Sequence, residues 1–86
     1  MVLCMETIGN LLEKFKVQVE LDEKVKNHKL TECNIDNITD YHTEKHENRT
    51  IHVFSGNINN NTTEVEYILD FKDNDIIRVL FNQTSA

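Results

Sequence analysis

The chain has 86 residues and a mass of 10.1 kDa, with nine Lys and Arg against fifteen Asp and Glu, which gives a net charge of −6. This charge argues against a protein that binds nucleic acid by neutralising phosphates and against a basic module that binds membrane surfaces. No apolar run approaches the ~18 residues of a membrane span. A chain of this size has room for one core. We therefore predict a single domain over residues 1–86, with no direct nucleic-acid partner and no membrane partner.

The composition points to the source and the compartment. Asn occurs eleven times, Ala once and Pro not at all, which is typical of an AT-rich coding sequence such as that of a phage or mobile element. The first ten residues carry no basic residue before their short apolar run, unlike a secretory signal. A small secreted domain also usually carries several disulfide bonds, whereas this chain has only Cys4 and Cys33. We therefore expect a cytoplasmic protein.

Asn-x-Thr sequons are the one observation that favours a secreted, glycosylated protein. Chance placement predicts roughly one such site. The sequence has five, at Asn37, Asn48, Asn60, Asn61 and Asn82. Asn and Thr both favour turns and strand ends, which also brings them together in sequence. We favour this second explanation.

The N-terminal segment has the apolar period of a helix. Cys4, Ile8, Leu11, Leu12 and Phe15 form one stripe, so we predict a helix over about residues 3–16. After this segment the period changes to two, which indicates half-buried strands. The predicted strands cover about residues 17–22, 28–35, 38–44, 49–54, 63–71 and 76–82.

The clearest strand signal lies in the C-terminal third. Val65, Tyr67, Leu69 and Phe71 alternate with Glu64, Glu66, Ile68 and Asp70, and the polar run 72–75 predicts the turn of a β-hairpin. In the strand over 49–54 we expect Ile51 and Val53 to face the core. No connection is long enough for a helical crossover, so the sheet should be antiparallel. The predicted fold is α+β: one N-terminal helix packed on an antiparallel β-meander of four to six strands.

The histidines do not have the spacing of a metal site or of a catalytic site. His42 and His46 are four residues apart, which on a strand separates them by about 13 Å, too far to share one metal ion. His42 and His52 could approach each other only if the turn lies between them. The sequence contains no Cys-x-x-Cys, no glycine-rich phosphate loop and no supported nucleophile–base pair. We therefore predict no metal, no cofactor and no enzymatic activity.

The acidic outer row of the C-terminal hairpin is the predicted partner-binding surface. Residues on one face of a strand recur at every second position, so an apolar residue flanked by carboxylates should project from this face. The predicted site consists of Glu64, Glu66, Ile68, Asp70, Asp73 and Asp75. A solvated face that only keeps the protein soluble is the alternative.

These features favour a small acidic non-enzymatic protein-binding domain. We expect an inhibitor or antagonist, of phage, mobile-element or immunity-like type, that engages a basic surface of a host protein, for example a groove that normally holds nucleic acid. The alternative is a structural or assembly subunit that forms a homodimer or larger homo-oligomer through its sheet. Native mass separates the two hypotheses.

Overall fold

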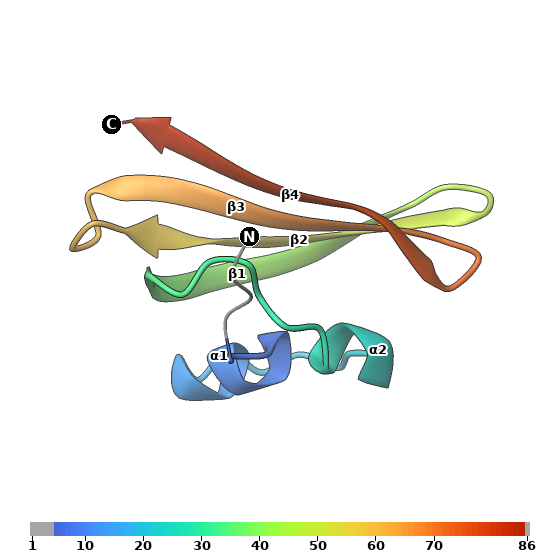
Figure 1. Cartoon of the computed structure of the whole chain (residues 1–86), viewed down its shortest axis with the longest axis horizontal. Helices are drawn as coiled ribbons and strands as arrows, with labels where there is room; N and C mark the ends of the chain where they lie inside the picture. The colour runs from blue at the N-terminus through green and yellow to red at the C-terminus, as the bar shows by residue number, and fades with distance from the viewer. Residues whose placement is uncertain (1–4, 86) are drawn as a thin grey trace.

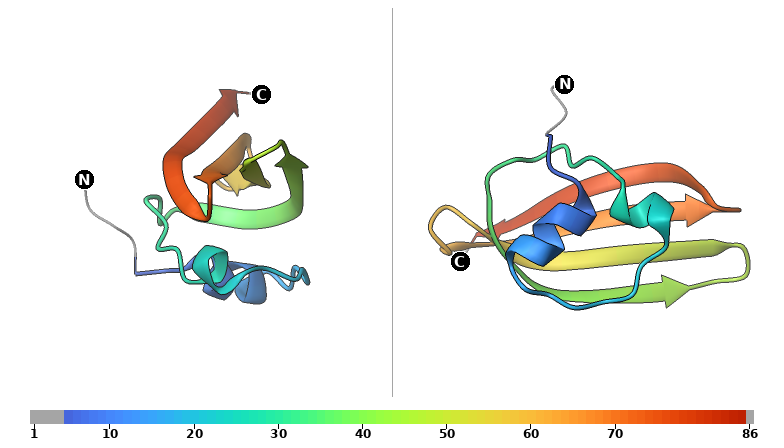
Figure 2. Two further views of the ribbon diagram at one scale, coloured as in Figure 1. Left: turned by 90° about the vertical axis from the view of Figure 1, so that its right-hand side faces the viewer. Right: turned by 90° about the horizontal axis from the view of Figure 1, so that it is seen from below.

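The computed structural model describes residues 5–85 and shows a four-stranded antiparallel sheet with two short helices on one side of it (Figures 1 and 2). The strands follow the order β1-β2-β3-β4, so each pairs with its neighbour in sequence. The prediction of an α+β fold with an antiparallel meander is confirmed. The elements are α1 (Ile8–Lys14), α2 (Glu23–Lys26), β1 (Ile35–Lys45), β2 (Arg49–Ile58), β3 (Thr63–Lys72) and β4 (Asp75–Ser85).

Helix α1 is shorter than the predicted range of 3–16, and the first part of that range, with Cys4, lies outside the described residues. Thr7 begins the helix by accepting a hydrogen bond from the backbone N–H of Asn10. Lys16 ends it with φ 60°, and the N–H groups of Lys16 and Val17 bond the carbonyls of Glu13 and Leu12. This is the Schellman arrangement, in which glycine usually takes the left-handed position.

The segment between the two helices is extended but belongs to no strand. Residues 17–22 were predicted as a strand, and their burial does alternate, with Val17, Val19 and Leu21 half-buried. They form no hydrogen-bonded ladder with the sheet. An alternation with a period of two shows only that an extended chain has two different faces, and it does not specify a hydrogen-bonding partner. The predicted strand over 28–35 is likewise reduced to one isolated bridge between Thr7 and Lys29 before β1 begins.

The middle strands are longer than predicted. The ranges 38–44 and 49–54 lie within β1 and β2, and β2 continues past its predicted end, through Gly56 to Ile58. A Cβ atom on Gly56 would lie 2.1 Å from the carbonyl oxygen of Asn37, so only glycine fits there. Strand β1 compensates with two irregularities in its register beside this contact.

The core lies between the helices and one face of the sheet. Val65, Tyr67, Leu69 and Phe71 are buried there, as the alternation in β3 predicted. Ile8, Leu11 and Leu12 of α1 and Val25 of α2 belong to the same apolar cluster, with Leu30, Ile35, Ile38, Phe54 and Ile58. The turn between β3 and β4 has only two residues, both with positive φ, and joins strands close to the predicted ranges 63–71 and 76–82.

One prediction about β2 is wrong. His52 and Phe54 pair with Leu69 and Tyr67 and therefore face the helices, so that Ile51 and Val53 face the other way. The reason is that β2 carries apolar residues on both faces, and Phe54, the last residue of the predicted strand, together with Ile58 beyond it, fixes which face meets the core. Within residues 5–85, no helix combines the length and the apolar character needed to cross a membrane.

Candidate functional site

The face of the sheet opposite the helices, here called the open face, carries the first four residues of the predicted site. Because Val65 and Tyr67 are buried toward the helices, the alternate residues of β3 point to the open face. Antiparallel pairing fixes their neighbours in β2, since directly paired residues project from the same face. The pairs are Glu64 with Asn57, Glu66 with Ser55, Ile68 with Val53, and Asp70 with Ile51.

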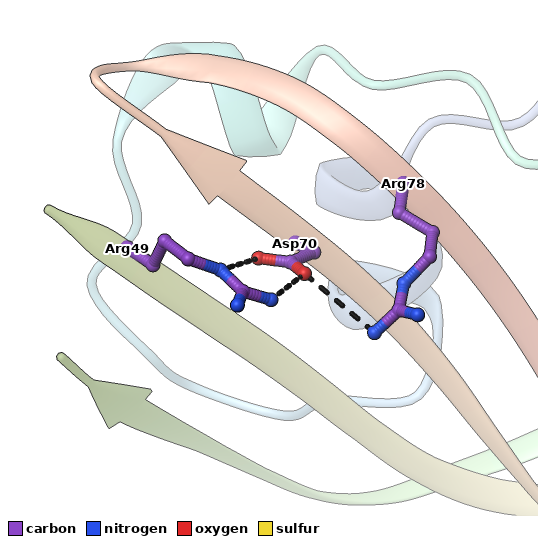
Figure 3. A network of polar contacts seen from close by, with 3 residues as sticks. All are labelled: Arg49, Asp70 and Arg78. Atoms are coloured by element: carbon purple, nitrogen blue, oxygen red, sulfur yellow. Dashed lines mark hydrogen bonds and ion pairs between the residues drawn. The ribbon is translucent and has the colours of Figure 1, made fainter.

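Asp70 lies on this face, but it is buried, whereas the prediction of an acidic outer row placed it at the surface. Only 1% of it is accessible, and its carboxylate accepts hydrogen bonds from Nε of Arg49, at 3.2 Å, and from Nη2 of the same guanidinium (Figure 3). Nη2 of Arg78 lies 3.7 Å from the carboxylate on the other side. Hydrogen bonding to Arg49 lowers the pKa of Asp70, and the charge of Arg78 acts in the same direction. Asp70 is therefore a buried ionic link between β2, β3 and β4.

Glu64 and Glu66, in contrast, are exposed and border a hollow of about 580 Å³ on the open face. Ser55, Asn57 and Thr84 contribute hydroxyl and amide groups to its lining. The lining contains no Lys or Arg, and neither carboxylate forms an ion pair with any residue in the described range 5–85. The two carboxylates lie about 7 Å apart along the strand, so each raises the energy of the other's charge.

Asp40 was not part of the predicted site, but it lies on the same face. It is exposed, and it pairs with Ser55, whose other neighbour is Glu66. Sequence reasoning missed Asp40 and Ser55 because they come together with Glu66 only through the pairing of β1 with β2 and of β2 with β3, which no local pattern predicts. The alternation of exposed polar residues in β1 was the one available signal.

Ile68 follows Glu66 on the open face, where it is half-buried. Its pairing partners across the sheet are Val53, which is 3% exposed, and Leu80, which is half-buried. A band of apolar side chains therefore crosses the middle of the open face. It separates the acidic hollow from the buried Asp70.

Asp73 and Asp75 are exposed, but the structure does not bring them to the hollow. They lie at and beside the turn between β3 and β4, which is about 30 Å along the strand from Glu64. The main-chain N–H of Asp73 bonds the carbonyl of Asn48 in the neighbouring turn. The predicted site thus separates into an acidic hollow, a buried ion pair and an acidic turn.

The histidines also fall on different faces. His42 pairs with Val53 on the open face, whereas His52 pairs with Thr43 and faces the helices, so the two imidazoles do not meet across the hairpin. Nδ1 of His52 lies 2.8 Å from the hydroxyl of Tyr41, and burial lowers the pKa of His52. Among residues 5–85, no group of three or more His, Cys, Asp or Glu side chains could hold a metal ion.

Cys33 is disulfide-bonded. The only other cysteine of the sequence, Cys4, lies outside the described residues. Disulfide bonds persist mainly in oxidising compartments. Because Cys33 forms a disulfide bond, the small number of cysteines no longer supports a reducing compartment. The cytoplasmic location stays a prediction.

No protein-family model, no curated protein and no solved structure matches this chain.

Proposed function

We propose that this chain is a small acidic non-enzymatic protein-binding domain that uses its open face to engage a basic surface of another protein. The observation that carries the proposal is the pair Glu64 and Glu66, two exposed carboxylates at one hollow that form no ion pair with any residue between 5 and 85. An inhibitor or antagonist of a host protein is the role that fits this chemistry and the AT-rich composition.

The hollow suits a cationic side chain. The carboxylates of Glu64 and Glu66 repel each other, and a cation placed between them removes this repulsion. An arginine from the partner could donate several hydrogen bonds at once, to the carboxylates and to the oxygens of Ser55 and Asn57. Asp40 strengthens the negative field at the rim and would accelerate the encounter with a basic surface.

Ile68 supplies the apolar contact beside the hollow. A half-buried aliphatic side chain next to charged groups is a typical centre of a binding surface, because docking removes its remaining area from water. Asp70 contributes indirectly. Its carboxylate neutralises the guanidinium of Arg49, a cation that would otherwise compete for the acidic residues, and the bonds between them link β2 and β3 under the contact surface.

A capture experiment with matched charge reversals tests this proposal. Immobilised wild-type protein is compared with Glu64→Lys/Glu66→Lys and with the control Glu13→Lys/Glu47→Lys. Both double variants change the net charge from −6 to −2, because each Glu→Lys adds two charges. The control residues are exposed and lie in α1 and in the turn between β1 and β2.

A basic protein of the native host that binds the wild type and the control, but not Glu64→Lys/Glu66→Lys, supports the proposal. Equal retention by all three proteins would show that the acidic face only maintains solubility. Equal loss from both variants would show that net charge, and not the hollow, governs binding.

A further inference from the structure

Two of the five Asn-x-Thr sequons lie at positions where the fold does not account for asparagine. Asparagine is favoured in turns because it tolerates positive φ and because its side chain bonds nearby backbone groups. Asn60 and Asn61 fit this explanation, since both have positive φ in the turn between β2 and β3, and Asn37 is half-buried in β1. Asn48 and Asn82 do not fit it. Neither has positive φ, and neither side-chain amide bonds any residue between 5 and 85.

Asn82 lies in the second half of β4 and is exposed. Asparagine is depleted in strands, so strand propensity does not explain its presence there. Its direct partner across the sheet is Glu66, which places the Asn82 side chain on the open face. Thr84, the third residue of the sequon, follows on the same face and is also exposed. Both functional groups of this sequon therefore face solvent.

Asn48 lies at the tip of the hairpin between β1 and β2, at one end of the sheet (Figure 1). Its main-chain carbonyl accepts a hydrogen bond from the N–H of Asp73, while its side chain is exposed. A group attached to this amide would extend away from the end of the sheet and would not meet the core. The fold can therefore accommodate a large substituent at Asn48 as well as at Asn82.

The disulfide bond of Cys33 is an independent observation that points in the same direction. Disulfide bonds form and persist in oxidising compartments, among them the lumen of the endoplasmic reticulum, where asparagine side chains also receive glycans. A high asparagine content in an AT-rich sequence can create sequons by chance, but it does not create a disulfide bond. The two observations therefore support one compartment separately.

We propose that Asn48 and Asn82 carry N-linked glycans, and that the chain acts in a secretory or extracellular compartment. The side-chain amide nitrogen forms a bond to the anomeric carbon of an oligosaccharide carried on a lipid diphosphate. The bond from that carbon to the diphosphate oxygen breaks, the lipid diphosphate leaves with the electron pair, and the amide nitrogen loses one proton. This proposal replaces the prediction of a cytoplasmic location.

A glycan on Asn82 would also change the edge of the sheet. Strand β4 is an edge strand and has no charged residue after Arg78, whereas the other edge, β1, is protected by the exposed carboxylates of Asp36, Asp40 and Glu44. A bulky hydrophilic glycan beside β4 would hinder the approach of another strand. It would border the acidic hollow on the β4 side only. The inference does not rest on the proposed function, because it concerns attachment of a glycan and not binding of a partner.

Peptide mapping by mass spectrometry of the protein from its native source tests the proposal. Peptide-N-glycosidase hydrolyses the bond between the glycan and the amide and leaves aspartate in place of asparagine. The treated protein should therefore contain aspartate at positions 48 and 82, and the untreated protein should contain glycopeptides there. Alkylation without prior reduction should leave Cys33 unlabelled, because its thiol is held in the disulfide bond.

Variants of the full chain, expressed through the secretory pathway of a eukaryotic cell, test the two sites individually. Asn48→Gln, Asn82→Gln and Thr84→Ala should each remove one glycan from the wild-type mass. Thr84→Ser should keep it, because serine also completes the sequon. The control Asn10→Gln, at an exposed asparagine of α1 outside any sequon, should leave the mass distribution of the glycans unchanged. Masses are measured on total cell protein, so that a variant retained by the cell is still counted.

Native protein with unmodified asparagine at positions 48 and 82 would overturn the proposal. Glycans confined to the turn between β2 and β3 would overturn the assignment to these two sites. A Thr84→Ala variant that keeps the glycan at position 82 would show that the sequon does not direct the attachment. Complete alkylation of Cys33 in unreduced native protein would contradict the oxidising compartment.

Discussion

Replacement of the buried carboxylate of Asp70 should destabilise the protein far more than the same change at an exposed position of the same strand. Asp70→Asn keeps the size of the side chain but removes the charge that Arg49 and Arg78 neutralise. A hydrogen bond to a charged group contributes about 1.5–3 kcal/mol. The side chains of Arg49 and Arg78 remain 40% and 59% exposed, so water can solvate them once the carboxylate is gone.

The expected loss is therefore about 2–3 kcal/mol, nearer the contribution of one such bond than of two. A domain of this length has a free energy of unfolding of roughly 4–13 kcal/mol. Urea denaturation followed by far-UV circular dichroism measures the difference. Glu66→Gln is the matched control, an exposed carboxylate-to-amide change on the same face of β3, and should stay within about 0.5 kcal/mol.

The acid limb of the stability curve provides an independent check. Hydrogen bonding to Arg49 lowers the pKa of Asp70, whereas an aspartate of the unfolded chain titrates near 3.9. The stabilisation is therefore fully present above about pH 4 and is lost as the pH falls through the folded-state pKa. Below pH 4 the wild type should lose stability more steeply than Asp70→Asn. Parallel acid limbs, with an Asp70→Asn variant as stable as Glu66→Gln, would refute the reasoning.

Four further outcomes are expected. Gly56→Ala should lower the free energy of unfolding by at least about 2 kcal/mol in urea titrations, because its Cβ would overlap the backbone of Asn37. Lys16→Gly should raise it by about 0.5 kcal/mol, because Lys16 has a positive φ, whereas Lys14→Gly inside α1 should lower it by about 1 kcal/mol. A reductant should lower the melting temperature through loss of the Cys33 disulfide, and an unchanged melting curve would contradict this. Added zinc should leave the melting temperature unchanged, whereas a concentration-dependent rise would reveal an unrecognised metal site.

The C-terminal hairpin could be predicted from the sequence because its signals are local. Strand β3 has a buried apolar residue at every second position from Val65 to Phe71, and Asp73 and Asn74 tolerate the positive φ values that a two-residue turn requires. Alternation also predicted that Glu64 and Glu66 share a face with Asp70. These features depend on residues within a few positions of one another.

The failures involve contacts between distant parts of the chain. The segment 17–22 has the alternation of a strand, but whether an extended segment finds a pairing partner depends on the rest of the fold. Burial of Asp70 depends on Arg49, 21 residues away in sequence, and on the register that brings both to one face. The hollow beside Glu66 likewise requires Ser55 from β2 and Thr84 from β4, and no local pattern identifies these neighbours.

The most direct test of the acidic hollow is the affinity of the captured basic protein for three purified variants at low and at physiological salt. Glu64→Lys/Glu66→Lys should weaken binding by about tenfold or more, which corresponds to roughly 1.4 kcal/mol, and should remove most of the salt dependence. Glu13→Lys/Glu47→Lys, which has the same net charge, should stay within about threefold of the wild type and keep its salt dependence. Equal weakening by the two variants would contradict a role for the hollow and would leave only a general attraction between an acidic and a basic protein.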